Sequence, residues 1–285
     1  CNESTTRGLG LGADTRFSTQ TNTTEDLSLN LRWAVSERVG LNIDVQKIDS
    51  TVVNFDNSMN NKTFADEDLD ISGDKPKFSF TPARGWGMTA GGFADPQNWF
   101  HEWTMEHTEH SQGDEMAYRL DADIKLGDDG GWLDSLRVGV RRAEREQNIN
   151  WSTYNWGSVM PLWSLVPGQN VFLNQSPWEG TYEEHDLGSQ LVGGGVFPGG
   201  VFLHPSMDLV KDYQGTIDLF GGRSNSWIPL GERPCAGFGP GGLYCPVEQQ
   251  TVTEDVDAAY LMLKFGGDDT NFGSVNVRGN IGVRF

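Results

Sequence analysis

Side chains that could do chemistry gather first in the segment HEWTMEHTEH, His101 to His110. On a helix, His107 and His110 would share one face with Glu106 nearby, and imidazole and carboxylate groups are ligands that metals accept. The segment is not a HExxH motif, because its histidines have the wrong spacing. The prediction is therefore structural or solvent-facing histidines, with no metal and no other cofactor.

Carboxylates near aromatic residues offer a second kind of chemistry, and they are Glu102, Glu106, Glu183 and Glu184. A glycosidase needs two carboxylates about 5 to 9 Å apart, and the sequence alone places no such pair. Cys1 fits either a lipidated mature terminus or a cysteine whose partner lies outside this chain. These features motivate an alternative function, a surface-exposed glycan-binding lipoprotein or a glycan-active hydrolase, whereas the main prediction is a protein that is not an enzyme.

Aromatic rings among small polar residues mark a possible binding surface in EQNINWSTYNWGSVMPLW, residues 146 to 163. Such rings can stack on sugar faces while neighbouring amides bind hydroxyl groups. Rings of this kind also occur in membrane-interface girdles and in the small cores of loops. The predicted ligand-binding residues are Trp151, Tyr154, Trp156 and Trp163.

Two of the three cysteines, Cys235 and Cys245, enclose a loop rich in glycine and proline, CAGFGPGGLYC. Because these residues let the backbone turn back on itself, a local disulfide is predicted, which favours an oxidising compartment. A pair of zinc thiolates is the competing interpretation. It is disfavoured because the sequence has no second cysteine pair nearby.

Strands with one apolar and one polar face must position these residues. In the segment 113 to 145, two alternating runs flank a turn at Gly127–Gly131, and the same pattern occurs in residues 24 to 46 around the turn Ser36–Arg38 and again between 259 and 284. In the central hairpin we expect Leu120, Ile124, Val138 and Val140 on the lipid side and Arg119, Asp123, Arg137 and Arg141 on the inner side.

A soluble sandwich can show the same alternation, but its solvent face is usually short and mixed, whereas the wall of a membrane barrel keeps the period for nine or more residues. Trp33, near a short turn, suits an aromatic at the lipid interface, or else the core of a sandwich. No run of about 18 apolar residues is present, so no transmembrane helix is predicted. The predicted fold class is all-β, a portion of an antiparallel transmembrane β-barrel with long extracellular loops at about 54–112 and 146–250.

The charge of the chain limits its partners. Its 285 residues include 40 acidic and 21 basic side chains, for a formal net charge of -19. A phosphate backbone requires a basic surface to release its counterions, so nucleic acid is not an expected partner. Neutral sugars need rings and amides but no opposite charge, which leaves an oligosaccharide or another small nutrient as the expected ligand.

Several blocks resemble the barrel of the TonB-dependent receptor family, in particular the large proteobacterial receptors associated with carbohydrate uptake. They are GDEMAYRLDADIKL, LRVGVRRAEREQNINWSTYNWGS, VTEDVDAAYLMLKFGGDD and VRGNIGVRF, of which WSTYNWG and GNIGVRF are the more specific. The resemblance implies a barrel of about 22 strands closed by an N-terminal plug domain. The sequence departs from that pattern, since it contains no TonB box, no plug-like segment and no signal peptide. We therefore expect residues 1–285 to be part of such a barrel.

The resemblance implies a receptor in the outer membrane of a Gram-negative bacterium that takes up a nutrient with energy supplied through TonB. Its partners would be the oligosaccharide or other nutrient, outer-membrane lipid, and TonB acting through the missing plug portion. In a barrel the short turns face the periplasm, which would put Trp151, Tyr154, Trp156 and Trp163 at the extracellular end.

Overall fold

The structure, a computed structural model, describes residues 8–83, 89–127, 132–160, 170–186, 200–266, 271–272 and 275–285. The chain forms mostly antiparallel sheet, so the predicted all-β class is confirmed. Its strands are β1 (Leu9–Ala34), β2 (Val39–Asp70), β3 (Lys77–Pro82), β4 (Phe100–Lys125), β5 (Leu133–Asn150), β6 (Asn155–Ser158), β7 (Tyr182–Asp186), β8 (Val201–Pro205), β9 (Gln249–Phe265), β10 (Asn271–Phe272), β11 (Val275–Asn276) and β12 (Gly279–Arg284). The helices α1 (Met207–Lys211) and α2 (Tyr213–Phe220) follow β8, and in the described residues no helix is long and apolar enough to span a membrane.

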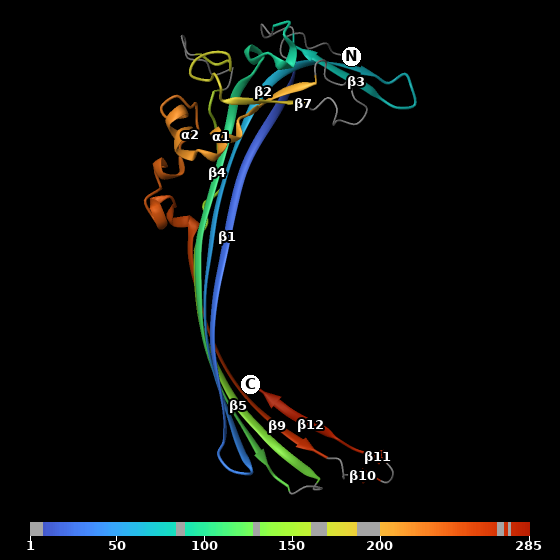
Figure 1. The fold of residues 1–285 in the computed structure, drawn as a ribbon, viewed down its shortest axis with the longest axis vertical. Helices are drawn as coiled ribbons and strands as arrows, with labels where there is room; N and C mark the ends of the chain where they lie inside the picture. The colour runs from blue at the N-terminus through green and yellow to red at the C-terminus, as the bar shows by residue number, and fades with distance from the viewer. Residues whose placement is uncertain are drawn as a thin grey trace. The chain divides into compact units, whose positions relative to one another are not determined.

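Among the described residues, one sheet has eight strands, ordered β1-β2-β4-β5-β9-β12, with β3 paired to β2 and β6 paired to β4. Strands β7 and β8, and likewise β10 and β11, form two-stranded sheets. Strands β1, β2 and β4 of this sheet can be followed in Figure 1. The chain divides into two compact units. Unit 1 comprises Cys1–Gln20, Asn54–Glu109 and Trp151–Glu248, and unit 2 comprises Thr21–Val53, His110–Asn150 and Gln249–Phe285.

Unit 2 is a sheet with one apolar face, and the register shows how the strands build it. Leu120 of β4 lies opposite Val140 of β5, and Val140 lies opposite Ala259 of β9. Paired residues share a face of the sheet, so apolar positions of neighbouring strands form a continuous surface. The side chains on it are exposed, with 44% exposure at Leu120 and 52% at Val140. Thus no described part of the chain covers this face, as the second sheet of a sandwich would.

The opposite face of unit 2 carries ion pairs. Asp121 lies opposite Gly139, and Gly139 lies opposite Tyr260, so three strands meet in one row. Asp121 is buried and accepts a hydrogen bond of 2.6 Å from the Tyr260 hydroxyl, while the Arg119 Nε lies 2.9 Å from its other oxygen. Arg145 pairs with Glu115 at 2.7 Å in the same sheet. This register confirms the predicted separation of apolar and charged faces in the central hairpin. Residues 128–131 of the hairpin turn lie outside the described part of the chain.

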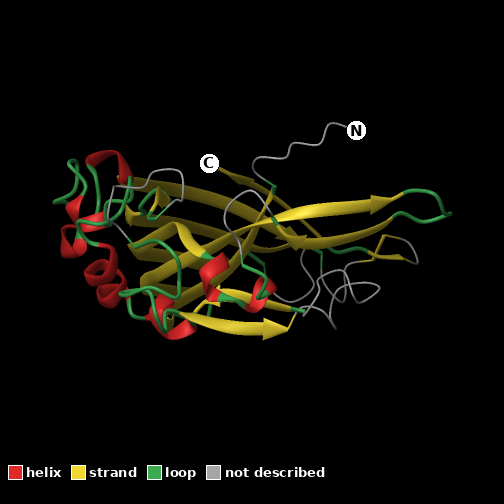
Figure 2. Cartoon of the chain, turned by 90° about the horizontal axis from the view of Figure 1, so that it is seen from above, coloured by secondary structure: helices red, strands yellow, loops and turns green. Residues whose placement is uncertain are grey.

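Unit 1 has an aromatic core where the ends of β2 and β4 meet the segments that follow β6. Trp99 packs edge-on against Phe202, with ring centroids 5.3 Å apart, and Trp178 stacks on Phe220 at 5.4 Å. These four rings are almost fully buried. Most of the helical segments, all of which belong to unit 1, gather on one side of the strands (Figure 2).

The expected loops at 54–112 and 146–250 were wrong in their boundaries. Strand β2 continues to Asp70, β4 begins at Phe100, and β5 and β9 extend over residues 146–150 and 249–250. In unit 1, polar residues of β2 are buried instead of alternating with apolar ones: Asn57 donates to the Val210 carbonyl at 2.8 Å, and Asn61 to the Leu203 carbonyl at 2.9 Å. Because segments distant in sequence cover this strand, it lacks the two-residue period that marks a half-exposed strand.

Candidate functional site

An exposed row of aromatic side chains lies where β4 pairs with β6 in unit 1. Met105 of β4 lies opposite Trp156 of β6, so their side chains share one face with Trp103, two positions away on β4. The Trp103 and Trp156 ring centroids are 4.8 Å apart, with 57° between the ring planes. Trp156 is 59% exposed and Trp103 partly exposed, whereas Met105 beneath them is buried. The two indoles thus offer apolar surface to the solvent.

The row continues along β4 to His107, which lies on the same face as Trp103 and Met105 by strand alternation. The His107 ring is buried beneath two further rings, with centroid distances of 4.6 Å to Trp151 and 4.6 Å to Tyr154. Trp151 and Tyr154 meet edge to face at 5.6 Å, and both are exposed. We call Trp103, Trp151, Tyr154 and Trp156 the aromatic platform.

An ion pair with one buried partner joins β1 to β2 and interacts electrostatically with a platform ring. The Arg16 guanidinium of β1 binds the Asp56 carboxylate of β2 through two nitrogens, and Asp56 is buried while Arg16 is largely exposed. The hydrogen bond to Asp56 and the charge of that carboxylate raise the pKa of Arg16, and Tyr154 contributes a smaller electrostatic effect. An exposed, planar hydrogen-bond donor therefore lies within electrostatic reach of a platform ring.

The other face of the β4–β6 pair is covered by the loop that follows α2. A side chain at Gly157 would collide with the backbone of Trp227, so glycine lets this loop approach closely. Glu106, opposite Asn155, is fully buried and accepts hydrogen bonds from the Asn155 Nδ2 at 2.7 Å and the Leu230 backbone N–H at 2.9 Å. Burial raises the pKa of Glu106, and these hydrogen bonds oppose that effect. The carboxylate thus joins the loop to the strand that carries Trp156.

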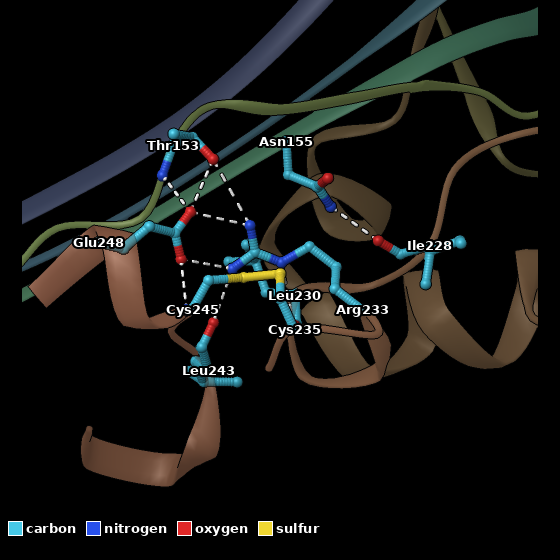
Figure 3. The surroundings of a disulfide bond; sticks show 9 residues. All are labelled: Thr153, Asn155, Ile228, Leu230, Arg233, Cys235, Leu243, Cys245 and Glu248. Atoms are coloured by element: carbon cyan, nitrogen blue, oxygen red, sulfur yellow. Dashed lines mark hydrogen bonds and ion pairs between the residues drawn. A yellow bond between two sulfur atoms is a disulfide. The ribbon is translucent and has the colours of Figure 1, made fainter. Parts of the chain in front are cut away.

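Residues 151–153, which lead into β6, are held by Glu248 (Figure 3). The Glu248 Oε1 accepts hydrogen bonds from the Thr153 backbone N–H at 2.7 Å and the Thr153 hydroxyl at 2.6 Å, and the Glu248 carbonyl accepts one from the Trp151 N–H at 3.0 Å. From the other side, the Thr108 carbonyl accepts a hydrogen bond of 2.9 Å from the Ser152 N–H. The backbone between two platform residues is therefore bound from both directions.

Glu248 itself is fixed by Arg233 and by the disulfide loop (Figure 3). The Arg233 guanidinium donates to both carboxylate oxygens, at 2.9 and 2.8 Å, and the Cys245 backbone N–H donates at 2.7 Å. The side chains of Arg233 and Glu248 are only 11% and 3% exposed. Burial alone would raise the pKa of Glu248, but the hydrogen bonds from Arg233, Cys245 and Thr153 outweigh it and lower that pKa to about 2.

The predicted disulfide is present: Cys235 and Cys245 are bonded, with their Cα atoms 5.0 Å apart. Cys245 is buried, whereas Cys235 is exposed. Closing a loop of this length restricts the unfolded chain by about 3 kcal/mol in the chain-entropy estimate. The bond therefore stabilises the folded state, in which this loop presents the Cys245 N–H to Glu248.

Of the predicted ligand-binding residues, the structure brings together Trp151, Tyr154 and Trp156, and Trp163 lies outside the described residues. His107 and His110 both lie in strand β4, so the shared helical face that a metal site would have needed is not formed. His107 and His101 are structural: His107 Nδ1 lies 2.7 Å from the Ser152 carbonyl oxygen, and His101 Nε2 lies 2.8 Å from the Thr181 hydroxyl. Burial lowers the pKa of His101 to about 3.

The candidate catalytic carboxylates are engaged in contacts of unit 1. Glu102 forms an ion pair with Lys62, Glu106 binds the Leu230 N–H as described, and Glu183 accepts a hydrogen bond of 3.1 Å from the Met207 N–H. Glu184, next along β7, points to the opposite face from Glu183 by strand alternation. In the described part of the chain, no three histidine, cysteine or acidic side chains are grouped so that they could hold a metal ion.

Three contributions were missed by the sequence analysis: Trp103 in the platform, the Arg16–Asp56 pair beside it, and the Glu248–Arg233 pair behind it. A signal for Trp103 existed, because Trp103, Met105 and His107 alternate with polar residues in the way that a strand requires. The two ion pairs join residues far apart in the chain or inside an irregular loop. No local pattern in the sequence indicates these two ion pairs.

Comparisons of the chain with family models, with curated proteins and with solved structures found no match.

Proposed function

We propose that this chain is part of an outer-membrane receptor that takes up a nutrient, with the apolar face of unit 2 in contact with lipid and the aromatic platform of unit 1 in contact with an oligosaccharide. The observation that carries the proposal is the register of unit 2, which places exposed apolar side chains of neighbouring strands on one face and ion pairs on the other. A soluble sheet would leave so large an apolar surface in water, where it favours association.

The length of the apolar band supports contact with a membrane. Along β5, the nine residues 133–141 separate Trp132 from Arg142. At a rise of about 3.3 Å per residue they extend roughly 30 Å, and a tilted membrane-spanning strand needs about 9–11 residues. Arg142 binds Glu144 and lies 3.4 Å from Asp257, so the apolar face ends in charged side chains that suit water and headgroups.

At the end of the band where the β1–β2 and β4–β5 turns lie, aromatic side chains suit an interface. Trp132 is 52% exposed and stacks on Phe265, and Trp33 is similarly exposed near the β1–β2 turn. Indole rings favour the boundary between hydrocarbon and water. Within the described residues β1 pairs with β2 alone and β12 with β9 alone, so a closed barrel requires further strands beyond these.

The choice of ligand rests on the platform. Three of its rings are exposed and Trp103 is partly exposed, the segment 151–153 is fixed by Glu248, and the Arg16 guanidinium interacts electrostatically with Tyr154. Sugars present apolar faces for stacking and hydroxyl groups for hydrogen bonds, and they match this combination. Energised uptake through TonB is supported by the resemblance of the sequence blocks alone.

The ligand is tested on the protein in detergent micelles by titrating a panel of neutral and acidic oligosaccharides while intrinsic tryptophan fluorescence is followed. Trp156→Ala and Tyr154→Ala should each weaken binding of the best ligand by a factor of about 2 to 12, since an aromatic contact contributes about 0.5–1.5 kcal/mol. Trp132→Ala, an exposed tryptophan of unit 2, is the matched control and should leave affinity unchanged. Equal affinities in all three variants would mean that the platform does not bind the sugar.

A further inference from the structure

We infer that Glu248, Arg233 and the Cys235–Cys245 disulfide form a clamp that positions the aromatic platform, so that binding by the platform depends on the oxidised state of these cysteines. The affinity part of this inference rests on the proposed function. The positioning part rests on contacts in unit 1 alone.

Hydrogen bonds link the disulfide loop to the Glu248 carboxylate. The Cys245 N–H donates to Glu248 Oε2. The Arg233 Nη2 donates to the same oxygen and also to the Leu243 carbonyl, which is 2.9 Å away. Leu243 and Cys245 both belong to the loop that the disulfide closes. Opening the disulfide frees this loop, and with it two of the groups that fix the orientation of the carboxylate.

Glu248 in turn binds the chain segment that carries platform rings. Glu248 binds Trp151 and Thr153 through their backbone N–H groups, and Tyr154 follows directly in the chain. Arg233 also donates to the Leu230 carbonyl at 3.2 Å, and the Leu230 N–H reaches Glu106, which holds Asn155. The clamp therefore holds positions 151, 153 and 155, while the rings of Tyr154 and Trp156 remain exposed.

The disulfide is accessible to a reductant from the side of Cys235. Cys235 is exposed, so a reductant in solution can reach the disulfide without unfolding of the core. Three of the platform rings, Trp151, Tyr154 and Trp156, belong to the four-residue strand β6 and the segment before it, which have little structure of their own to hold them once Glu248 is released.

The test uses hydrogen exchange of the full chain in micelles, read in the peptide that covers residues 150–156. Three samples are compared with the wild type: the wild type treated with a reductant, the variant Cys235→Ser/Cys245→Ser, and Glu248→Gln. Glu144→Gln, which alters an exposed carboxylate paired with Arg142, is the matched control. Peptides from the β5–β9 pairing and from residues 57–63 report whether the fold is retained.

We expect exchange at Thr153 to rise by about tenfold in the three samples, because its amide is bound by the Glu248 carboxylate, whose orientation each change disturbs, and a hydrogen bond of ordinary strength corresponds to about this factor. The Trp151 amide is bound by the Glu248 backbone carbonyl, so its exchange should rise when the disulfide is opened but not in Glu248→Gln. Glu144→Gln should match the wild type. The affinity for the oligosaccharide found by titration should fall by a similar factor. Unchanged exchange at these amides after the disulfide is opened, with the other peptides protected, would overturn the inference.

The two proposals fail separately. If exchange rises but the wild type binds no oligosaccharide from the panel, the clamp stands and the proposed ligand is wrong. If exchange rises while oligosaccharide affinity is unchanged, the dependence of binding on the disulfide is refuted.

Discussion

Replacing Glu248 with glutamine should destabilise unit 1 by about 3–5 kcal/mol, the range seen when one partner is removed from a buried ion pair. Arg233 would keep its charge at a position where its side chain is only 11% exposed, and the amide of glutamine supplies one acceptor oxygen in place of two. A lowering of the Glu248 pKa from 4.5 to about 2 corresponds to about 3 kcal/mol of stabilisation of the charged form. The loss expected for a broken buried ion pair and the stabilisation that corresponds to the lowered pKa are therefore of similar size.

The assay is urea unfolding of the full chain in detergent micelles, followed by tryptophan fluorescence. Glu248→Gln is compared with Arg233→Met and with the double variant Glu248→Gln/Arg233→Met. The double variant should recover part of the loss, because it removes the unpaired charge. Glu144→Gln, at an exposed pair, should cost about 0–1 kcal/mol. A loss below about 0.5 kcal/mol for Glu248→Gln would refute the reasoning, since that is the scatter of surface substitutions.

Three further predictions concern pH, packing and the lipid face. Because the folded-state pKa of Glu248 is lowered, its stabilising effect should be present above about pH 4.5 and lost as the pH falls toward 2, which urea midpoints across this range would show for the wild type but not for Glu248→Gln. Gly139→Ala should destabilise unit 2 by about 1–3 kcal/mol, because the new methyl group would collide with Tyr260 and Asp121, and the same unfolding assay measures it. Val140→Arg should lower the yield of protein folded into lipid vesicles, at a cost of about 2–4 kcal/mol, whereas Val252→Arg, on the opposite face of the sheet, should fold like the wild type.

The sequence predicts the strands of unit 2 well because each has one face in solvent and one apolar face, so burial imposes a period of two residues on the chain. The Leu120–Val140 pairing and the charged row of Arg119 and Arg141 follow from this period and a short turn. The disulfide was also predictable, since its two cysteines flank a loop that has few other residues to pack.

Unit 1 was harder to predict because its polar residues are buried by segments distant in sequence. Asn57 is satisfied by a carbonyl 153 positions away, and nothing near Asn57 in the chain indicates that partner. The histidine segment was assigned to a long loop, although Trp103, Met105 and His107 follow the period of a strand. The clamp could not be predicted either, since Glu248 ends one three-residue 3-10 helix and Arg233 follows another, and elements this short have no periodicity in the sequence.

The placement of unit 2 in a membrane is tested most directly by single spin labels along β5 in lipid bilayers. Labels replace residues 136, 137, 138, 140 and 141 in turn, in a chain that carries Cys1→Ser and keeps the Cys235–Cys245 disulfide. The account predicts that labels at 136, 138 and 140 are relaxed by oxygen dissolved in the lipid, whereas labels at 137 and 141 are relaxed by a water-soluble nickel complex. Equal access of the nickel complex at all five positions would contradict it.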